Sequence, residues 1–266
     1  MTSNKQPIGF FDSGVGGTSI WKEVIALLPN ENTIYLSDSA NAPYGEKSKE
    51  EIIDLCIKNV ELLLQEKCKL IVVACNTATT NAINFLRNKY AVPFIGIEPA
   101  IKPAALITKT KTIGILATKG TLNSSLFEKT SNTIRKDILI KETIGKGLVE
   151  LIEGGKLKSN EMTILLSSFL KPMMDSNIDS LVLGCTHYPY LIPQIRKIVG
   201  SKIRIIDSGE AVAKQTKAIL SKNELLNTTE NYLAKHSINI NSDKSVLENL
   251  LSNIKNENIK ITERNF

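Results

Sequence analysis

Short β-branched runs alternate with longer amphipathic runs along most of the chain, and this pattern restricts it to one broad fold class. The short runs have the composition of buried strands, and apolar residues recur in the longer runs at the spacing of a helix face. Strands that alternate with helices predict a mostly parallel sheet with helices on both faces. The predicted strands cover residues 8–12, 33–38, 70–74, 93–97, 112–117, 179–184 and 204–207, and the predicted helices cover residues 18–28, 49–66, 79–88, 122–134, 147–154, 160–175, 190–199 and 210–222.

The alternation starts twice, which indicates two similar halves. The run Ile8-Gly-Phe-Phe-Asp-Ser-Gly resembles Ile113-Gly-Ile-Leu-Ala-Thr-Lys-Gly, and each half later reaches a strand that ends at a cysteine, Cys75 or Cys185. We predict two similar doubly wound α/β domains with mostly parallel sheets, related by a pseudo-twofold axis. Residues 1–97 with 208–266 would form the first domain, and residues 98–207 the second. The alternative explanation for the similarity of the two halves is that all α/β folds resemble one another.

Composition excludes several function classes. The 266 residues are 42% hydrophobic and carry a formal net charge of +6. A chain of this length buries a core without disulfide bonds. The basic excess raises the question of nucleic acid, but only five residues are arginine, and the lysines of residues 47–69 alternate with acids. This charge pattern is typical of a solvated surface, so we expect no nucleic-acid partner.

The chain ends carry no targeting or membrane signal. Residues 1–7 are polar and lead into a strand, without the layout of a signal peptide, and no apolar run has the length of a membrane span. A cytoplasmic protein with four free cysteines is expected. Residues 223–266 hold ten asparagines, and we predict one helix over residues 245–254 with flexible ends, packed on the first domain. His236 is expected at the surface.

A glycine-rich turn follows the first predicted strand. The sequence Asp12-Ser-Gly-Val-Gly-Gly17 permits a tight turn and leads into a helix whose free N–H groups suit an anion. The spacing of its glycines differs from the dinucleotide-binding fingerprint. An ordinary strand-to-helix turn is the alternative, and the acidic Asp12 at the strand end favours a functional site.

Two of the four cysteines occupy matching positions. Cys75 and Cys185 each follow a predicted strand and precede a predicted helix, a setting that lowers the pKa of a thiol and exposes a thiolate. Cys56 and Cys68 are interpreted as small buried apolar residues.

His187 lies two residues after Cys185, where a solvent-facing or capping role is the alternative to catalysis. A zinc site formed by Cys75, Cys185 and His187 lacks support from ligand spacing, so no metal is expected. A serine triad is excluded because the G-x-S-x-G motif is absent from the sequence.

Five motifs together are similar to those of the glutamate racemase family, within the aspartate/glutamate racemase superfamily. They occur in the family's order and span the chain from about Ile8 to Lys217. The motifs are Gly9-Phe-Phe-Asp-Ser-Gly-Val-Gly-Gly17, Ser37-Asp-Ser-Ala-Asn-Ala-Pro-Tyr-Gly45, Val73-Ala-Cys-Asn-Thr-Ala-Thr79, Leu148-Val-Glu-Leu-Ile-Glu153 and Leu183-Gly-Cys-Thr-His-Tyr-Pro189.

The resemblance implies interconversion of L- and D-glutamate, which supplies D-glutamate for peptidoglycan, with no cofactor and no metal. It implies Cys75 and Cys185 as the two catalytic bases, acting on D- and L-glutamate respectively. Asp12 would support Cys75, and His187 and Glu153 would support Cys185. It also implies that the two domains face each other across a cleft that holds the active site. A possible homodimer is implied as well. The implied substrate contacts are Asp12, Ser13, Asp38, Pro43, Tyr44, Gly45, Asn76, Thr77, Thr118, Thr121, Thr186 and His187.

Racemisation requires removal of a proton from one face of Cα and delivery of a proton to the other face, which two opposed bases accomplish. Because the motifs contain no arginine, hydroxyls, amides and backbone N–H groups would bind the substrate carboxylates. Without the resemblance, Glu153 and Asp38 could each be interpreted as an ordinary surface carboxylate instead of a site residue. For the whole chain, the alternatives are a racemase of aspartate or a hydantoin, a two-cysteine redox or metal-binding protein, and a non-catalytic anion-binding module.

Overall fold

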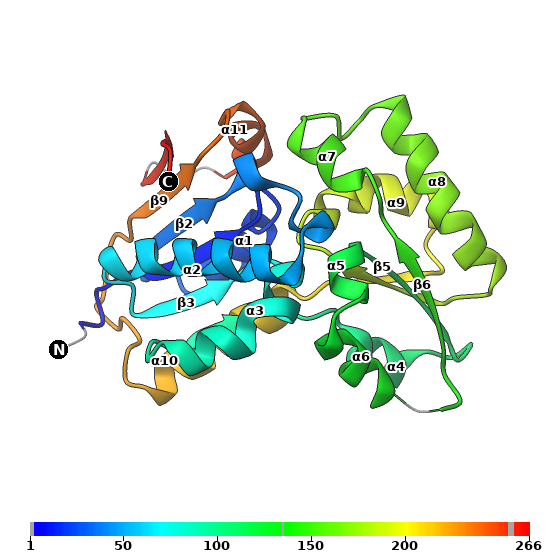
Figure 1. The fold of residues 1–266 in the computed structure, drawn as a ribbon, viewed down its shortest axis with the longest axis horizontal. Helices are drawn as coiled ribbons and strands as arrows, with labels where there is room; N and C mark the ends of the chain where they lie inside the picture. The colour runs from blue at the N-terminus through cyan, green and yellow to red at the C-terminus, as the bar shows by residue number, and fades with distance from the viewer. Residues whose placement is uncertain (1–2, 135, 255–257) are drawn as a thin grey trace.

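Two parallel sheets lie side by side in the protein. The computed structural model describes residues 3–134, 136–254 and 258–266. The first sheet has the strand order β10-β9-β2-β1-β3-β4, the second has the order β6-β5-β7-β8, and neighbouring strands pair in parallel in both. Figure 1 shows the first sheet on the left and the second on the right. This two-sheet α/β architecture confirms the predicted fold class.

The first sheet has the fully buried strand β1 at its centre. Every residue of β1 is buried, which explains its continuous apolar sequence. The strands of this sheet are β1 (Ile8–Asp12), β2 (Thr33–Ser37), β3 (Leu70–Val73), β4 (Phe94–Gly96), β9 (His236–Ile240) and β10 (Ile259–Glu263).

Helices cover both faces of the first sheet. One apolar cluster joins a sheet face to α1, α10 and α11, and a second cluster joins the opposite face to α2 and α3. The longest of these helices, α2, has Ser48 as its N-cap residue, which forms a capping box with Glu51. The bounds are α1 (Thr18–Leu27), α2 (Lys49–Gln65), α3 (Asn76–Lys89), α10 (Gly209–Lys222) and α11 (Ser245–Leu251).

The second sheet has the same plan with four strands. Helices α7, α8 and α9 pack on one face and α4 and α6 on the other. The strands are β5 (Thr112–Ala117), β6 (Leu139–Ile144), β7 (Ser180–Gly184) and β8 (Arg204–Ile206). The helices are α4 (Ile101–Ile107), α5 (Lys119–Leu122), α6 (Ser125–Asn132), α7 (Leu148–Glu153), α8 (Asn160–Asp175) and α9 (Ile192–Val199). Three short 3-10 turns are η1 (Ser39–Asn41), η2 (Tyr44–Glu46) and η3 (Tyr188–Leu191).

The strand orders of the two sheets correspond. β1 has β2 and β3 as neighbours, and β5 has β6 and β7, so β3 and β7 hold equivalent places. Cys185 directly follows β7, and Cys75 follows β3 after one intervening residue, Ala74. The chain leaves the first sheet after β4 and returns to it after β8, close to the proposed domain boundaries at residues 97/98 and 207/208, which stay a prediction.

The C-terminal segment differs from its prediction. Residues 236–240 and 259–263 form the strands β9 and β10, which extend the first sheet beyond β2, instead of flexible ends. The prediction of flexible ends also covered residues 255–257, which lie outside the described part of the chain. Isoleucines at every second position of each strand pack into the core, and this period of two outweighs the high asparagine content.

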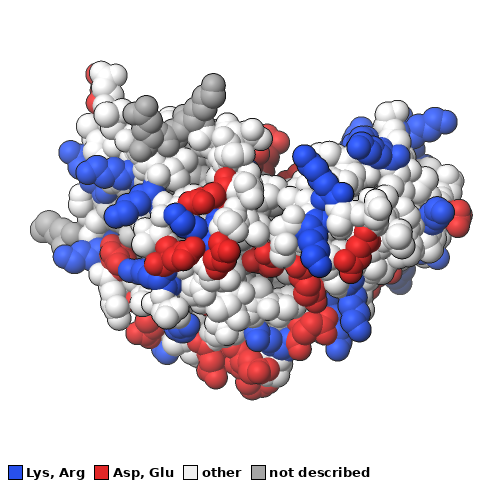
Figure 2. All heavy atoms as spheres, turned by 90° about the horizontal axis from the view of Figure 1, so that it is seen from above, with Lys and Arg blue, Asp and Glu red and all other residues white. Residues whose placement is uncertain are grey.

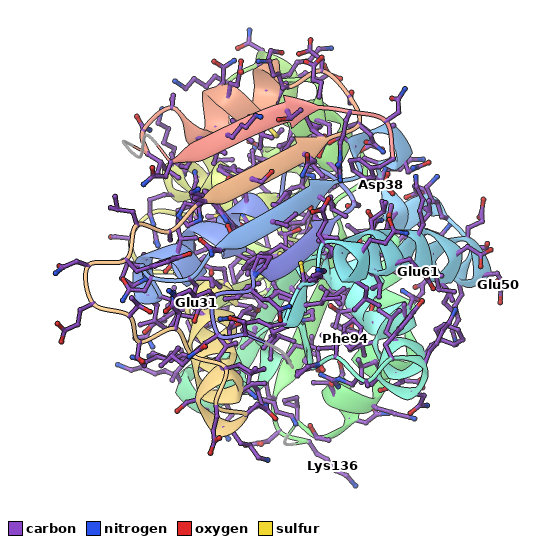
Figure 3. The ribbon with its side chains drawn as sticks, turned by 90° about the vertical axis from the view of Figure 1, so that its left-hand side faces the viewer. Glu31, Asp38, Glu50, Glu61, Phe94 and Lys136 are labelled. Atoms are coloured by element: carbon purple, nitrogen blue, oxygen red, sulfur yellow. The ribbon has the colours of Figure 1, made fainter. Side chains whose placement is uncertain are left out.

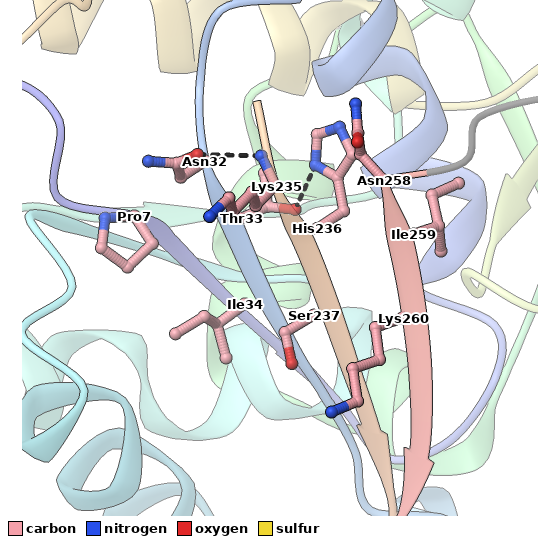
Figure 4. A pocket seen from close by; sticks show the side chains of 10 residues that line it. All are labelled: Pro7, Asn32, Thr33, Ile34, Lys235, His236, Ser237, Asn258, Ile259 and Lys260. Carbon is pink, nitrogen blue, oxygen red and sulfur yellow. Dashed lines mark hydrogen bonds between the residues drawn. The ribbon is translucent and has the colours of Figure 1, made fainter. Parts of the chain in front are cut away.

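The prediction for His236 was also wrong. Its side chain is buried at the beginning of β9, where Nδ1 is 2.9 Å from the Thr33 hydroxyl and the ring lies edge-on against Trp21. Figure 4 shows His236 in a groove at the amino ends of β2, β9 and β10, opposite the strand ends that carry the cysteines.

Three other elements differ from the sequence analysis. Strand β6 and helix α4 were not predicted, and the predicted helix 122–134 begins only at Ser125, as α6, after the separate short helix α5. β6 is an edge strand with mostly half-exposed residues, which hides its pattern. In α6, the Ser124 hydroxyl caps a new helix start.

The surface mixes charges of both signs. In the view of Figure 2, lysine and arginine side chains alternate with aspartate and glutamate side chains. This is the distribution expected of a solvated surface. Within the described residues, no helix combines the length and apolar character needed to cross a membrane.

Candidate active site

A small cavity lies between the carboxyl ends of the two sheets. It has an empty volume of about 240 Å³, and both Cys75 and Cys185 line it. Its other lining residues are Ser13, Pro43, Tyr44, Gly45, Asn76, Thr77, Thr118, Val149, Thr186 and His187. The equivalent ends of β3 and β7 thus bring one thiol from each half to the same space.

Cys75 is the N-cap residue of α3. Its Sγ accepts from the Ala78 N–H at 3.4 Å and donates to the Ser13 hydroxyl at 3.7 Å. We expected the helix N-terminus to lower the pKa of this thiol, but the pKa is raised well above its usual value. Burial is the main cause, and the negative Asp12 adds to it. Cys75 therefore holds its proton in this environment.

Asp12 is fully buried at the end of β1, on the Cys75 side of the cavity. Its Oδ2 accepts from the Gly17 N–H at 2.7 Å, and its Oδ1 accepts from Thr186 Oγ1 at 3.4 Å. Burial raises the pKa of Asp12, while the nearby His187 and the Gly17 N–H act against that rise. A carboxyl with a raised pKa beside Cys75 is suited to exchange a proton with it.

Cys185 begins a chain of polar contacts within the second half. Its Sγ lies 3.7 Å from His187 Nδ1, and His187 Nε2 lies 2.5 Å from Glu153 Oε1. Burial disfavours a charge on His187, but Cys185 and Glu153 together outweigh it and raise the pKa of His187 well above its usual value. The imidazolium is in position to stabilise a thiolate on Cys185. Unlike Cys75, Cys185 is followed by the 3-10 turn η3, and not directly by an α-helix.

The glycine-rich turn binds the protein's own carboxylates. The Val15 N–H donates to Glu153 Oε1 at 2.7 Å, as the Gly17 N–H does to Asp12. A methyl group on Gly14 would overlap the Glu153 carboxylate, and one on Gly16 would overlap the His187 ring. The glycines therefore permit the second half to pack directly on this turn. The predicted anion site exists, but Asp12 and Glu153 occupy its N–H groups.

Three predicted substrate contacts, Asp12, Asp38 and Thr121, are not among the described residues that line the cavity. Asp38 and Thr121 stand behind it. Asp38 is fully buried beyond the carboxyl end of β2 (Figure 3). Its Oδ2 accepts from the Tyr44 hydroxyl at 2.5 Å, so it holds a lining residue in place. Thr121 Oγ1 lies 2.9 Å from Thr118 Oγ1 and 3.3 Å from Thr77 Oγ1. The geometry favours supporting roles for both, and direct substrate contact stays a prediction.

The sequence analysis assigned no role to several residues at this site. Val149 lines the cavity, Ser39 donates to Glu153, and Asn59 and Asn241 donate to Asp38. Ser39 follows Asp38 inside a motif, so its position was a usable signal. Asn241 belongs to the C-terminal segment, and no sequence pattern connects it to the site.

The other cysteines lie elsewhere. Burial, aided by nearby acids, raises the pKa of Cys56 and raises that of Cys68 to about 12. All four cysteines are free thiols. The described residues contain no group of three or more histidine, cysteine or acidic side chains placed to hold a metal ion.

Two matched parallel sheets that present one thiol each to a shared cavity define an enzyme suited to acid–base chemistry on two faces of one small molecule. The chain belongs to the Asp/Glu/hydantoin racemase family, whose model matches residues 17–216.

Individual relatives agree with this assignment. A glutamate racemase of Ralstonia pickettii is 47% identical over 215 residues, which cover 80% of this chain and 76% of that protein. The structure of Francisella tularensis glutamate racemase in complex with D-glutamate is 30% identical, with a TM-score of 0.83 over 97% of this chain and 98% of that one. The Escherichia coli glutamate racemase in complex with L-glutamate is 32% identical, with a TM-score of 0.82 over 97% of each chain.

Proposed function

We propose that this chain interconverts L- and D-glutamate by a cofactor-independent mechanism in which Cys75 and Cys185 are the two bases. The observation that carries the proposal is that both thiols line one cavity from equivalent strand ends of the two sheets. A substrate held between the two halves would present opposite faces of Cα to the two thiols. The relatives named as glutamate racemases, including the complexes with D- and L-glutamate, support glutamate as the substrate.

Each turnover moves one proton onto one thiol and another proton off the opposite thiol. In the L-to-D direction, the Cys185 thiolate removes the α-proton, and the electron pair of the broken C–H bond delocalises into the α-carboxylate. The Cys75 thiol then donates its proton to the other face of Cα and becomes a thiolate. His187 stabilises the anionic form of Cys185, and Asp12 is placed to return a proton to Cys75.

Neutral donors are available to bind the substrate carboxylates. Among the described residues that line the cavity, lysine and arginine are absent, and the polar groups are hydroxyls and one amide besides the catalytic side chains. Asn76 Nδ2 is buried without a hydrogen-bond partner in the described structure. An unpaired buried donor is costly, so we infer that a substrate carboxylate accepts from it. Ser13, Thr77, Thr118 and Thr186 would complete the binding set.

The biological setting follows from the product. We propose that D-glutamate from this reaction supplies peptidoglycan synthesis and that the enzyme works in the cytoplasm, where its free thiols stay reduced. A homodimer stays a prediction.

The first prediction tests the two-base mechanism by isotope transfer from solvent. In deuterated water, L- and D-glutamate serve as separate substrates, the enantiomers are separated at early times, and proton NMR measures deuterium at Cα. Nearly all deuterium is expected in the product, because the thiol that donates a proton has exchanged with solvent before the turnover. L-aspartate is expected to react much more slowly, and a chelator should leave the rate unchanged. Early deuterium in recovered substrate, or product that retains its original α-proton, contradicts two separate bases.

A further inference from the structure

We propose that Ser39 is a positioning residue for the Cys185 base and that it acts only when the two halves are closed. The proposal rests on the proposed function, because it concerns how the Glu153–His187 pair that serves Cys185 is held. Ser39 belongs to η1, which follows β2 of the first sheet, whereas Glu153 ends α7 beside the second sheet. The contact between them therefore joins the two halves of the molecule.

Both carboxylate oxygens of Glu153 are occupied, largely by groups of the first half. Oε1 accepts from the Val15 N–H at 2.7 Å and contacts His187 Nε2 at 2.5 Å. Oε2 accepts from the Ser39 hydroxyl at 2.8 Å. Two of these three partners, Val15 and Ser39, come from turns that follow β1 and β2. Closure of the halves thus completes the set of hydrogen bonds to the Glu153 carboxylate.

Ser39 is itself oriented. Its Oγ lies 3.1 Å from the hydroxyl of Ser37, which is fully buried at the end of β2. Because the Ser39 proton is donated to Glu153, the Ser37 hydroxyl is the donor in the contact between the two serines. The result is a directional series of hydrogen bonds from Ser37 through Ser39 to Glu153, whose other carboxylate oxygen accepts from the His187 imidazolium.

The closed arrangement is encoded in the chain. Gly14 and Gly16 leave space for the Glu153 carboxylate and the His187 ring against the first turn, and a larger residue at either position would block that approach. The loss of Ser39 would leave Oε2 without its donor and free the carboxylate plane to rotate. Since Glu153 fixes the His187 ring, this rotation would also displace the ring from its position beside Cys185. Cys75 would keep its contacts with Ser13 and Asp12.

The direct test compares Ser39→Ala with Ser39→Thr, which retains the hydroxyl. A hydrogen bond to a charged acceptor contributes about 1.5–3 kcal/mol, so we expect kcat/KM of Ser39→Ala to fall about tenfold or more, and that of Ser39→Thr by about threefold at most. Because the two enantiomers have equal free energy, kcat/KM must fall equally in both directions. The decisive readout is therefore the primary isotope effect with L- and D-glutamate deuterated at Cα. Ser39→Ala should raise the effect for one enantiomer only, L-glutamate if Cys185 acts on it.

A matched control separates positioning from closure. The Tyr190 hydroxyl lies 2.6 Å from Thr18 Oγ1, and this contact also joins the halves. Tyr190 contacts His187 through its main-chain N–H, which the substitution to phenylalanine retains, and its hydroxyl forms no hydrogen bond to the side chains of Glu153 or His187. Tyr190→Phe weakens closure without changing the carboxylate, so the ratio of its two isotope effects should stay that of the wild type. A wild-type ratio of the two isotope effects in Ser39→Ala, or wild-type kcat/KM in that variant, would overturn the proposal. If the wild-type protein does not racemise glutamate, the proposed function itself fails, and the two outcomes are distinct.

Discussion

Burial alone does not distinguish the four cysteines of this chain, because all of them are buried. Their surroundings do. Cys56 lies within α2 and Cys68 precedes β3, and neither is among the described residues that line the cavity. Cys75 and Cys185 have polar partners and a cavity in front of them. A thiol works as an acid or base only where a substrate reaches it and a neighbouring group exchanges its proton.

This difference predicts the outcome of four single substitutions. Cys75→Ala and Cys185→Ala should each abolish racemisation, with a loss of at least about a thousandfold in kcat, because each removes the only base on one face of Cα. Cys56→Ala and Cys68→Ala are the matched controls, since they remove equally buried thiols. They should keep near-normal kcat and lose about 1 kcal/mol or less of stability. Polarimetry with each enantiomer measures the rates, and near-normal turnover in either of the first two variants contradicts the mechanism.

At the residue scale, the sequence predicted which side chains meet but not how their contacts change them. The matching strand ends indicated Cys75 and Cys185, and the structure places both on one cavity. The direction of the Cys75 pKa shift was wrong, because the helix N-terminus was weighed without burial or the nearby Asp12. The Ser39–Glu153 contact depends on how the two halves close, which no local pattern describes.

Among the elements, the C-terminal strand β9 has the least expected role. Asn241, the residue after β9, donates from Nδ2 to Asp38 Oδ1 at 2.5 Å, and its Oδ1 accepts from the Ala40 N–H at 2.9 Å. Asp38 in turn accepts from Tyr44, whose pKa is raised by burial and by Asp38, so that its hydroxyl keeps its proton. The tail therefore supports the wall of the cavity, and its prediction as a flexible end missed this function.

Asn241→Ala should consequently weaken substrate binding more than chemistry. Loss of a hydrogen bond of about 1 kcal/mol predicts a rise of about fivefold in KM for both enantiomers, with kcat within about twofold of wild type. Asn239→Ala is the control from the same strand, because Asn239 donates to Ser237 and not to Asp38. Steady-state kinetics in both directions checks this prediction. A KM equal to that of wild type in Asn241→Ala would show that the tail does not support the cavity.

At the scale of the whole molecule, the repeat was the most informative part of the sequence. Two similar halves with a cysteine after the same strand predicted two parallel sheets with matching order, and the structure has them. The repeat could not predict β9 and β10, which only the first sheet possesses. It also could not predict that one apolar cluster continues from the first half into the second, through residues such as Val15, Leu116 and Leu148.

The pKa values of the two histidines, His236 and His187, are shifted in opposite directions. These shifts make the stability of the whole molecule depend on pH. Burial lowers the pKa of His236, which lies beside Thr33 and Trp21. For His187, burial acts against the charge, but Cys185 and Glu153 raise the pKa well above its usual value. Both histidines have a pKa of about 6.5 when unfolded. Stability rises with pH wherever the unfolded chain binds more protons than the folded chain, and falls where it binds fewer.

The thermal unfolding midpoint should therefore have a maximum near pH 6.5. Below pH 6.5 the unfolded chain protonates His236 while the folded protein does not, so stability falls as the pH falls. Above pH 6.5 the folded protein retains the His187 proton that the unfolded chain has lost, so stability also falls as the pH rises toward the folded pKa of His187. Differential scanning calorimetry from pH 5.5 to 8 checks the curve. Because Asp12 also has a raised pKa, it contributes to the pH dependence as well. Single variants are therefore needed to show which histidine causes the acid side of the curve and which the alkaline side. His236→Asn should flatten the acid side and His187→Asn the alkaline side, and a variant that leaves its own side unchanged removes that histidine from the account.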